Sequence, residues 1–534
     1  MAKLHTRHNV PVYGPRYVPR FIRGIMAAVQ LGRDEDGFLS LLERQYGPVV
    51  YLPWPLKQFF VLDNQTIQHQ PIRIAMQHAV FGSQPYIGQS GVLETKLFAA
   101  HSRGLSKLRL EQPVNRFNSN VEQSIDQILS SQFKNSSPVQ IDLINLVTNM
   151  LYQGATPALF GNNLLEFETH DQENEPIPSS NELQTHFWNF DNAFPLLTAQ
   201  VPLQRWIPTT RQGIKGRQNF VEHVSKWIQH DLPGLNEGVV RDMVDIGNQH
   251  EWQTIETAKL VLGTYWALQA NAPFASAHHI INLCQSPLIK QVQLEIQNYL
   301  NQNQNQQTNA LSFKELSNPL NLPLLSSTIW ETLRLNSSSF SIRIVTNEKG
   351  YVVGQSQSIS NQYKQEEEDD DDEQYKGHQN PLKQNLIIPE GELVICATRV
   401  SQMSTKIWGP DALEWKGDRF VIQDDHDGTK RLNQPLIKLV RSFGGGVSMC
   451  EGRHLALVEL KSFAIQFLST FDVNVIEPSS LLSTQQNSKY RQIKFAGTDK
   501  LGWTTGLKPG RVGMGIHQQQ GQLIATLTKR TKQS

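Results

Sequence analysis

The stretch Phe443–Gly452, FGGGVSMCEG, decides the fold of this chain. It fits the pattern FxxGxxxCxG, whose fixed positions are Phe443, Gly446, Cys450 and Gly452. A cysteine thiolate in such a loop can ligate a haem iron, where its electron donation favours O–O cleavage. Gly446 would let the chain double back so that amides point at the sulfur, Gly452 would keep the backbone close to the porphyrin, and Phe443 would shield the sulfur from water. The loop therefore predicts Cys450 as the metal ligand and the other three residues as cofactor contacts.

The residues after Cys450 indicate a helix. Apolar side chains recur there at helical spacing, namely Leu455, Leu457, Leu460, Ala464, Phe467 and Leu468. The positive end of this helix would point at the thiolate and lower the pKa of the thiol. The alternative is a buried structural cysteine in a glycine-rich turn.

Composition excludes several classes of protein. The chain has 534 residues, 39% of them hydrophobic, and its 49 Lys plus Arg balance 49 Asp plus Glu. A net charge of zero argues against a nucleic-acid binder, which normally has a basic excess. The three cysteines, Cys284, Cys396 and Cys450, are too few for a disulfide framework, so we expect a reducing compartment. No run of 18 apolar residues occurs, so the pattern predicts a soluble or membrane-surface chain.

Hydrophobic periodicity favours one mainly α domain with small β-sheets. Residues Ile255 to Ile281 are apolar on nearly every side, which predicts a long buried helix. Short strands are expected at Val49 to Tyr51, Phe59 to Leu62, Ile342 to Thr346 and Leu393 to Cys396. The expected organisation is a Pro-rich hinge over residues 1–35, a haem domain over 36–516 with polar loop insertions at about 301–309 and 355–383, and a polar tail over 517–534.

Two upstream segments complete a recognisable order. Glu331-Thr-Leu-Arg334 is followed by Trp415-Lys-Gly-Asp-Arg419-Phe420 and then by the cysteine loop. In this order the chain resembles the cytochrome P450 superfamily. The resemblance implies the P450 fold as a single large domain, with Glu331, Arg334 and Arg419 in a buried, salt-bridged structural triad. An uncompensated buried charge is costly, so the three should act as a unit that locks the cysteine loop to the helical core.

The same resemblance suggests which residues hold the haem propionates. Arg343 lies where members of the superfamily usually place an arginine that pairs with a propionate. Two residues before the cysteine, where Arg or His is usual, this chain has Ser448. Anchoring must then depend on Arg343 and on a helix nearer the N-terminus, where His101, Arg103 and Arg116 are candidates.

The segment Trp266–Phe274, WALQANAPF, departs from the usual oxygen-side helix. It lacks the acid–alcohol pair that delivers protons, and Pro273 should kink the helix. It resembles the branch that contains cholesterol 7-alpha-hydroxylase, sterol 12-alpha-hydroxylase and prostacyclin synthase. Asn271 is then the catalytic candidate, because it can order a water for proton delivery or bond a substrate oxygen. A simple bend in a core helix is the alternative.

The resemblance also indicates a substrate pocket. Its candidates are Trp266 and Ala270 on the central helix, Ser338 after the ExxR helix, and Thr505 near the C-terminus. Hydroxyl groups in an otherwise apolar pocket suit a large lipid with one or two oxygen atoms. Surface turns are the alternative for the serine and the threonine.

The implied function is that of a haem-thiolate monooxygenase carrying heme b. It would hydroxylate a sterol, steroid or similar lipid with dioxygen and electrons from a separate NADPH-cytochrome P450 reductase. The alternatives are an endoperoxide or hydroperoxide isomerase of the prostacyclin-synthase type, and a non-catalytic haem or lipid binder. Members of the superfamily lie at the endoplasmic reticulum membrane, so the resemblance implies that location, although no anchor is readable in this sequence.

Overall fold

The computed structural model describes fourteen segments of the chain: 18–46, 49–52, 58–61, 80–84, 92–133, 138–167, 180–199, 204–345, 351–353, 386–424, 428–445, 449–478, 490–508 and 514–530. They divide into two compact units, and each is described by itself. The first unit comprises Met1–Ile72, Ser339–Ser401 and Gly446–Ser448, and the second comprises Arg73–Ser338, Gln402–Gly445 and Met449–Ser534.

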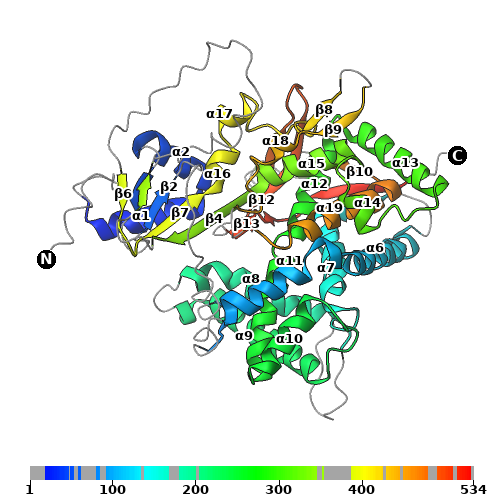
Figure 1. The fold of residues 1–534 in the computed structure, drawn as a ribbon. Coiled ribbons are helices and arrows are strands. Elements are labelled where there is room, and N and C mark those ends of the chain that lie inside the picture. Colours follow the sequence, from blue (N-terminus) through cyan, green and yellow to red (C-terminus); the bar gives the residue numbers. More distant parts are fainter. Residues whose placement is uncertain are drawn as a thin grey trace, which may run out of the picture. The chain divides into compact units, whose positions relative to one another are not determined.

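The first unit combines small sheets with α-helices. Its helices are α1 (Arg20–Arg33), α2 (Glu35–Tyr46) and the short α16 (Thr398–Gln402), which ends at the unit boundary; its strands are β1 (Val49–Leu52), β2 (Gln58–Val61), β4 (Ser337–Ile344), β5 (Tyr351–Val353), β6 (Leu386–Ile388) and β7 (Leu393–Ala397). Strand β2 pairs antiparallel with β1 and parallel with β7, and β7 pairs antiparallel with β4. The predicted strands in these four places are confirmed (Figure 1).

The second unit is mainly helical. Its helices are α5 (Phe98–Gly104), α6 (Glu111–Gln132), α7 (Leu143–Phe160), α8 (Ser180–Ala199), α9 (Pro208–Gln229), α10 (Val239–Gln249), α11 (Thr254–Gln269), α12 (Ala272–Gln285), α13 (Ile289–Asn305), α14 (Phe313–Ser317), α15 (Pro323–Asn336), α17 (Thr405–Trp408), α18 (Gln434–Ile437) and α19 (Arg453–Thr470), with short turns at Leu93–Leu97, Lys107–Arg109 and Gln204–Trp206. Its strands are β3 (Val139–Asp142), β8 (Val421–Gln423), β9 (Lys430–Leu432), β10 (Phe471–Val475), β11 (Tyr490–Lys494), β12 (Leu501–Leu507), β13 (Met514–Ile516), β14 (Gln519–Gln520) and β15 (Ile524–Lys529).

Helix α12 lies at the centre of this unit. It packs against α7, α15 and α19, and nearly all of its side chains are buried (Figure 1). Helix α19 is the helix predicted after Cys450, and it is buried against α6, α12 and α14. The mainly α fold with small sheets is confirmed. Because α12 and α19 contact each other, the segment after the cysteine is joined directly to the core.

The long helix predicted over Ile255 to Ile281 is broken in two. Helix α11 ends at Gln269, and the N–H of Ala270 still bonds the carbonyl of Trp266 at 2.9 Å. Asn271 leaves helical geometry with φ −122° and ψ −55°, and α12 starts with Pro273 in its first turn. A proline is tolerated in the first turn because those amides have no helical acceptor. The predicted kink at Pro273 is therefore confirmed, as a full interruption.

Two predicted segment boundaries are wrong. Residues 517–534 are not a polar tail, because β15 pairs with β10 on one side and β3 on the other. Leu523, Ala525 and Leu527 are fully buried and alternate with the more exposed Ile524 and Thr526, the period expected of a half-buried strand. The loop predicted at about 301–309 is helical as far as Asn305, where α13 ends, and residues 306–309 follow without helical structure. The second predicted insertion, 355–383, and residues 1–17 of the predicted hinge lie outside the described residues, while α1 occupies most of the remainder of that hinge.

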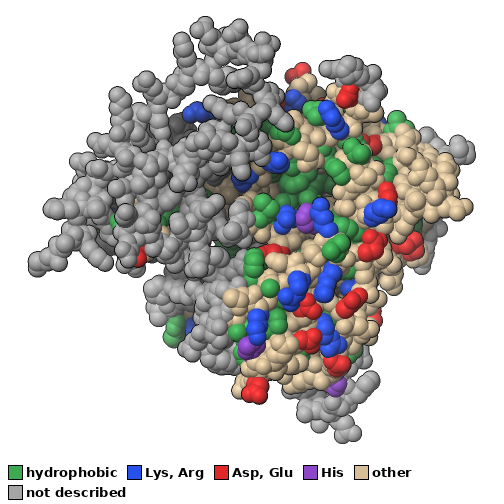
Figure 2. Space-filling view, viewed as in Figure 1, with side chains coloured by type: hydrophobic (Ala, Val, Ile, Leu, Met, Phe, Trp, Pro, Cys, Tyr) green, Lys and Arg blue, Asp and Glu red, His purple; other side chains and the backbone are tan. Residues whose placement is uncertain are grey.

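The described surface mixes charge signs. Figure 2 shows Lys and Arg side chains interspersed with Asp and Glu over the visible face, with hydrophobic side chains between them. None of the helices within the described ranges is long and apolar enough to cross a membrane.

Candidate functional site

The cysteine loop closes on itself through one backbone hydrogen bond. The N–H of Cys450 donates to the carbonyl of Phe443 at 3.0 Å. The half-buried ring of Phe443 meets Trp330 edge to face, with centroids 5.9 Å apart. Gly444 has φ +73°, a left-handed conformation that only glycine adopts without strain. Gly446 and Ser448 lie outside the described residues, so the roles proposed for them stay predictions.

The Cys450 thiol lies at the start of α19. Gly452 precedes the helix, and the backbone N–H groups of Gly452 and Arg453 bond the sulfur and lower its pKa. Cys450 is exposed as a residue, but the protein on one side of its sulfur desolvates the thiolate, and this burial raises the pKa more than the two amides lower it. The predicted lowering by the start of the helix is present in these two amides, but desolvation of the thiolate is the larger effect and the pKa is raised.

The space beside the sulfur is compatible with a haem. Among the described residues, a Cβ placed on Gly452 would meet the Cys450 sulfur at 3.9 Å and Leu105 at 4.0 Å, and a Cβ on Gly445 would meet no atom within 4 Å. An accessible soft donor, with two amides to stabilise its negative charge, suits an iron porphyrin. Residues at the cysteine loop thus fit a haem-thiolate cofactor.

The structure brings Glu331, Arg334 and Arg419 together. Arg334 donates to both carboxylate oxygens of Glu331, Nε at 2.7 Å and Nη2 at 2.8 Å, and both side chains are fully buried. Arg419 donates from Nε to Glu331 Oε1 at 3.0 Å and from Nη1 to Asp411 at 2.9 Å. The Asp411 contact adds the second carboxylate that two buried guanidinium groups require for neutrality. In this network the pKa of Arg419 is raised: burial opposes the charged form, but Glu331 and Asp411 outweigh it.

Gln402 connects this ionic cluster to the cysteine loop. Its carbonyl accepts Arg334 Nη1 at 2.5 Å. Its fully buried side chain accepts from the Arg441 N–H and the Ser442 hydroxyl, both at 3.2 Å, and donates to Ser337 at 2.8 Å. Arg441 and Ser442 come directly before the cysteine loop. Sequence reasoning missed Gln402, whose only signal is a glutamine that closely follows the apolar run of β7.

The candidates for propionate binding have different surroundings. Arg116 caps the end of α7, bonding the carbonyls of Pro157 at 3.0 Å and Ala158 at 2.8 Å. His101 bonds the Leu97 carbonyl and the Thr264 hydroxyl, each at 2.8 Å, while Arg103 is exposed. The Arg343 backbone lies in β4 and its side chain lies outside the described residues, so its haem contact stays a prediction.

Trp266 belongs to an aromatic cluster. Its ring stacks on Phe194 with centroids 4.0 Å apart, and it meets Phe81 edge to face at 6.3 Å. Its indole N–H donates to the fully buried Asp191 at 3.0 Å, and Gln518 donates to the other oxygen of Asp191 at 3.1 Å. No sequence pattern indicated that this carboxylate meets Trp266. Trp266 therefore contributes to packing between α8 and α11 whether or not it also touches a substrate.

The other pocket candidates are buried. Ala270 and Ser338 are fully buried, and Thr505 is 1% exposed. The hydroxyl oxygens of Thr505 and its neighbour Thr504 have no hydrogen-bond partner among the described residues. A buried hydroxyl without a partner is costly, so these two oxygens can bond a ligand or an internal water.

Asn271 makes a backbone contact far along the chain. Its Oδ1 accepts the N–H of Ile516 at 2.9 Å. The two N–H donors of its Nδ2 have no hydrogen-bond partner among the described residues. The Oδ1 of Asn271 is thus held by the Ile516 N–H, and its Nδ2 can donate to a ligand or a water.

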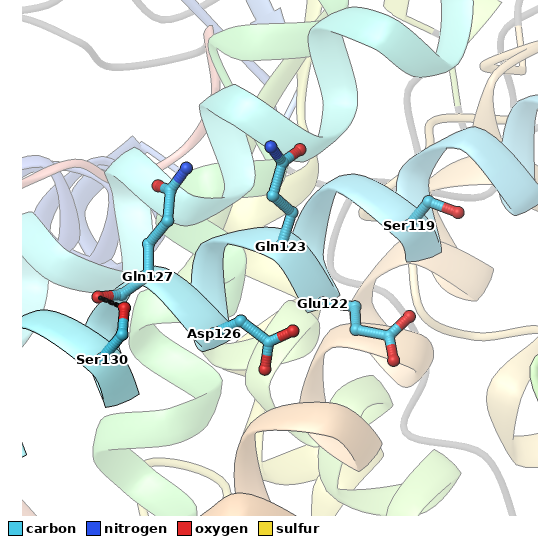
Figure 3. A pocket seen from close by; sticks show the side chains of 6 residues that line it. All are labelled: Ser119, Glu122, Gln123, Asp126, Gln127 and Ser130. Atoms are coloured by element: carbon cyan, nitrogen blue, oxygen red, sulfur yellow. Dashed lines mark hydrogen bonds between the residues drawn. The ribbon is translucent and has the colours of Figure 1, made fainter.

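A hollow of about 460 Å³ lies elsewhere, on the surface of α6 (Figure 3). Its lining comes from one helix face and is entirely polar: Ser119, Glu122, Gln123, Asp126, Gln127 and Ser130. A lipid site needs apolar walls, so this hollow is not a candidate for one.

Comparisons with known proteins agree with this geometry. Residues 382–495 match the family model for cytochrome P450. The chain is 24% identical to a cholesterol 7-alpha-monooxygenase of Cricetulus griseus over 61% of its own length and 58% of the relative's. It is 22% identical to a 5-beta-cholestane-3-alpha,7-alpha-diol 12-alpha-hydroxylase of Sus scrofa, over 63% of its own length and 60% of the relative's. It is 30% identical to an alkane hydroxylase of Arabidopsis thaliana, over 22% of its own length and 25% of the relative's.

The chain therefore spans about three fifths of the length of the two sterol-related enzymes that it matches. These relatives come from the branch that the central helix predicts, so the suspected branch is confirmed. The matched segment contains Arg419 of the ionic cluster and Cys450 of the cysteine loop. The resemblance to the cytochrome P450 family is thus confirmed by the family match over residues 382–495 and by these relatives.

Proposed function

We propose that this protein is a haem-thiolate monooxygenase that hydroxylates a sterol or similar lipid with dioxygen. The observation that carries the proposal is Cys450, an accessible thiol with two backbone amides on its sulfur and open space beside Gly452. The sterol oxygenases among its relatives support the substrate class. Electrons would come from a separate NADPH-cytochrome P450 reductase.

The cofactor that we propose is heme b, which would supply the oxygen-cleaving chemistry when bound. Cys450 would hold its iron, and the amides of Gly452 and Arg453 would stabilise the thiolate charge. Gln402 would hold the start of the cysteine loop in place, because it bonds both Arg334 of the ionic cluster and Ser442. Asn271 would orient a water or a substrate oxygen with its Nδ2 donors, and the Thr505 hydroxyl would bond a substrate oxygen.

We propose an endoplasmic reticulum membrane location. Helix α1 supports it, because Ile22, Met26 and Val29 are 38%, 41% and 45% exposed and recur on one face. An apolar face on an amphipathic helix suits the interface of a bilayer.

Cys450→Ser is expected to abolish the red-shifted Soret band of the reduced, carbon monoxide-bound protein, because that band needs thiolate ligation. Difference spectra of the purified protein measure it. Cys284→Ala is the matched control, because burial raises the pKa of Cys284 to about 12 and so disfavours its thiolate. A normal band in Cys450→Ser, or its loss in the control, would show that Cys450 is not the ligand.

Asn271→Leu is expected to uncouple a hydroxylase. NADPH oxidation should continue while hydroxylated product falls on the order of tenfold, less than the hundredfold or more of a true general acid, because an amide only orients the water. Hydrogen peroxide should rise in the same assay. Asn271→Asp keeps the acceptor for the Ile516 N–H, so the same leak in both variants would assign the effect to the Nδ2 donors.

The runner-up function is an endoperoxide or hydroperoxide isomerase, favoured by the lack of an acid–alcohol pair in WALQANAPF. Rapid peroxide rearrangement without NADPH or reductase, and no oxygenated lipid with them, would establish it. A haem-loaded protein inactive in both assays would instead be a carrier.

A further inference from the structure

Three polar side chains at the start of α12 and along it bond the C-terminal part of the chain. His278 and Gln285 lie two helical turns apart on one face of α12, and Asn271 is the non-helical residue directly before the helix. Asn271 Oδ1 accepts the N–H of Ile516 at 2.9 Å, and His278 Nε2 donates to the carbonyl of His517 at 2.8 Å. All of these contacts are made to backbone groups near the C-terminus. We call Asn271, His278 and Gln285 the polar stripe.

Gln285 makes a two-point contact at the far end of the stripe. Its Nε2 donates to the carbonyl of Trp503 at 2.9 Å, and its Oε1 accepts the Trp503 N–H at 2.8 Å. One amide side chain thus satisfies both backbone groups of one residue in β12. Such a contact fixes the strand in register as well as in position, because a slip of one residue would break both bonds.

Two glycines permit these close approaches. Gly515 has φ +116°, and a Cβ there would lie 2.0 Å from Asn271 Oδ1. A Cβ on Gly502 would lie 3.1 Å from Gln285 Oε1 and 3.0 Å from the Phe495 ring. Both ends of the polar stripe therefore meet backbone that carries no side chain at the point of contact.

The element held by the stripe is the C-terminal hairpin, defined as β11 and β12 with β14. Strand β12 pairs with β11 through Tyr490 to Thr505 and with β14 through Leu507 to Gln519. It also carries Thr504 and Thr505, whose buried hydroxyls have no partner among the described residues. The stripe thus fixes the position of two hydroxyls that are available to a ligand.

We propose that the polar stripe positions the C-terminal hairpin against the bound lipid, so that His278 and Gln285 determine which carbon is oxidised. They are positioning residues that act through Thr505, the pocket candidate, because Thr504 is its neighbour on the strand and points to the opposite face. The inference rests on the proposed function for its substrate, while the stripe and its contacts stand without it. A hairpin displaced by a fraction of an ångström would present a different carbon, because reaction requires near-contact geometry.

The test is Gln285→Met in the haem-loaded, full-length protein. Methionine keeps the length and removes both bonds to Trp503. Amide hydrogen exchange over residues 501–507 should rise at least about tenfold, since two hydrogen bonds of average strength are lost. With cholesterol as the probe, product should spread over more than one carbon while the carbon monoxide band is unchanged. Gln291→Met, an exposed glutamine on α13, is the matched control and should change neither measurement.

Two further variants test the contact between Gln285 and Trp503. Gln285→Glu retains the acceptor for the Trp503 N–H and should partly restore the protection, and Gly502→Ala should mimic Gln285→Met by displacing the glutamine. Unchanged exchange in Gln285→Met, or increased exchange with an unchanged product ratio, would overturn the proposal. If the wild type oxidises no sterol, the proposed function fails, and the exchange data alone then decide whether the stripe holds the hairpin.

Discussion

Glu331→Ala is expected to destabilise the protein by about 3–5 kcal/mol, the cost of leaving buried charges without their partner. Glu331 is fully buried and accepts from Arg334, from Arg419 and from the backbone N–H of Lys416 at 3.0 Å. Its loss leaves Arg334 with carbonyl acceptors, and it leaves Arg419 with the carboxylate of Asp411 and with backbone carbonyls. Stability of most domains is only 5–15 kcal/mol, so apoprotein or insoluble protein should result. Haem content and urea unfolding of the soluble fraction measure it.

The matched control is a carboxylate in an exposed pair. Asp242→Ala removes a partner that lies 3.4 Å from the half-exposed Arg109, and such pairs contribute about 0–1 kcal/mol. Glu331→Gln should lie between the two, because it keeps one acceptor oxygen. A well-folded, fully haem-loaded Glu331→Ala protein would refute the structural role of the cluster.

The sequence predicted those parts of the site whose residues lie close together along the chain. The cysteine loop and the helix after it occupy one contiguous segment, and ExxR places Glu331 and Arg334 one turn apart on a helix. Residue type and spacing are enough for such features because local backbone geometry brings the side chains together. The prediction that Arg419 meets them came from the order of motifs within a family.

The parts that the sequence missed depend on distant backbone. Gln402 reaches the start of the cysteine loop some 40 residues away, and Asn271 meets Ile516 only because Gly515 leaves room. No periodicity encodes a contact between a side chain and a remote carbonyl or amide. The break at Asn271 also needed the structure, because a proline indicates a bend without giving its extent. The net direction of the Cys450 pKa required weighing burial against two amides, which residue identity does not supply.

Glu459 is a buried acid that these motifs do not explain. It lies on α19, nine residues after Cys450, is 1% exposed, and both its oxygens lack a hydrogen-bond partner among the described residues. Burial alone raises its pKa from 4.5 to about 8. Two other buried titratable groups lie on α19 and on α12, which packs against it. Burial lowers the pKa of Lys461 on α19 to about 8 and that of His279 on α12 to about 3. Neither contributes to the shift of Glu459.

The sign of the pH effect follows from the two pKa values of Glu459. Below about 4.5 the carboxyl is protonated in both the folded and the unfolded state, so it adds no pH dependence. Between 4.5 and 8 only the unfolded state ionises, and the free energy of unfolding falls as pH rises. At about 1.4 kcal/mol per pH unit, the loss reaches at most about 5 kcal/mol near pH 8. Lys461 acts in the window above pH 8, where its folded pKa lies below its unfolded value.

Glu459→Gln is therefore expected to match the wild type at pH 5 and to exceed its stability increasingly up to pH 8. Glutamine keeps the shape and leaves equivalent polar atoms without partners, so only the ionisation is removed. Urea midpoints at fixed haem loading and ionic strength measure the difference, and the effects of His279 and Lys461 cancel because both proteins carry them. Glu122→Gln, on the exposed polar face of α6 drawn in Figure 3, controls for the loss of a surface charge. Parallel pH profiles for Glu459→Gln and the wild type would mean that Glu459 finds a partner in solution and is not held neutral by burial.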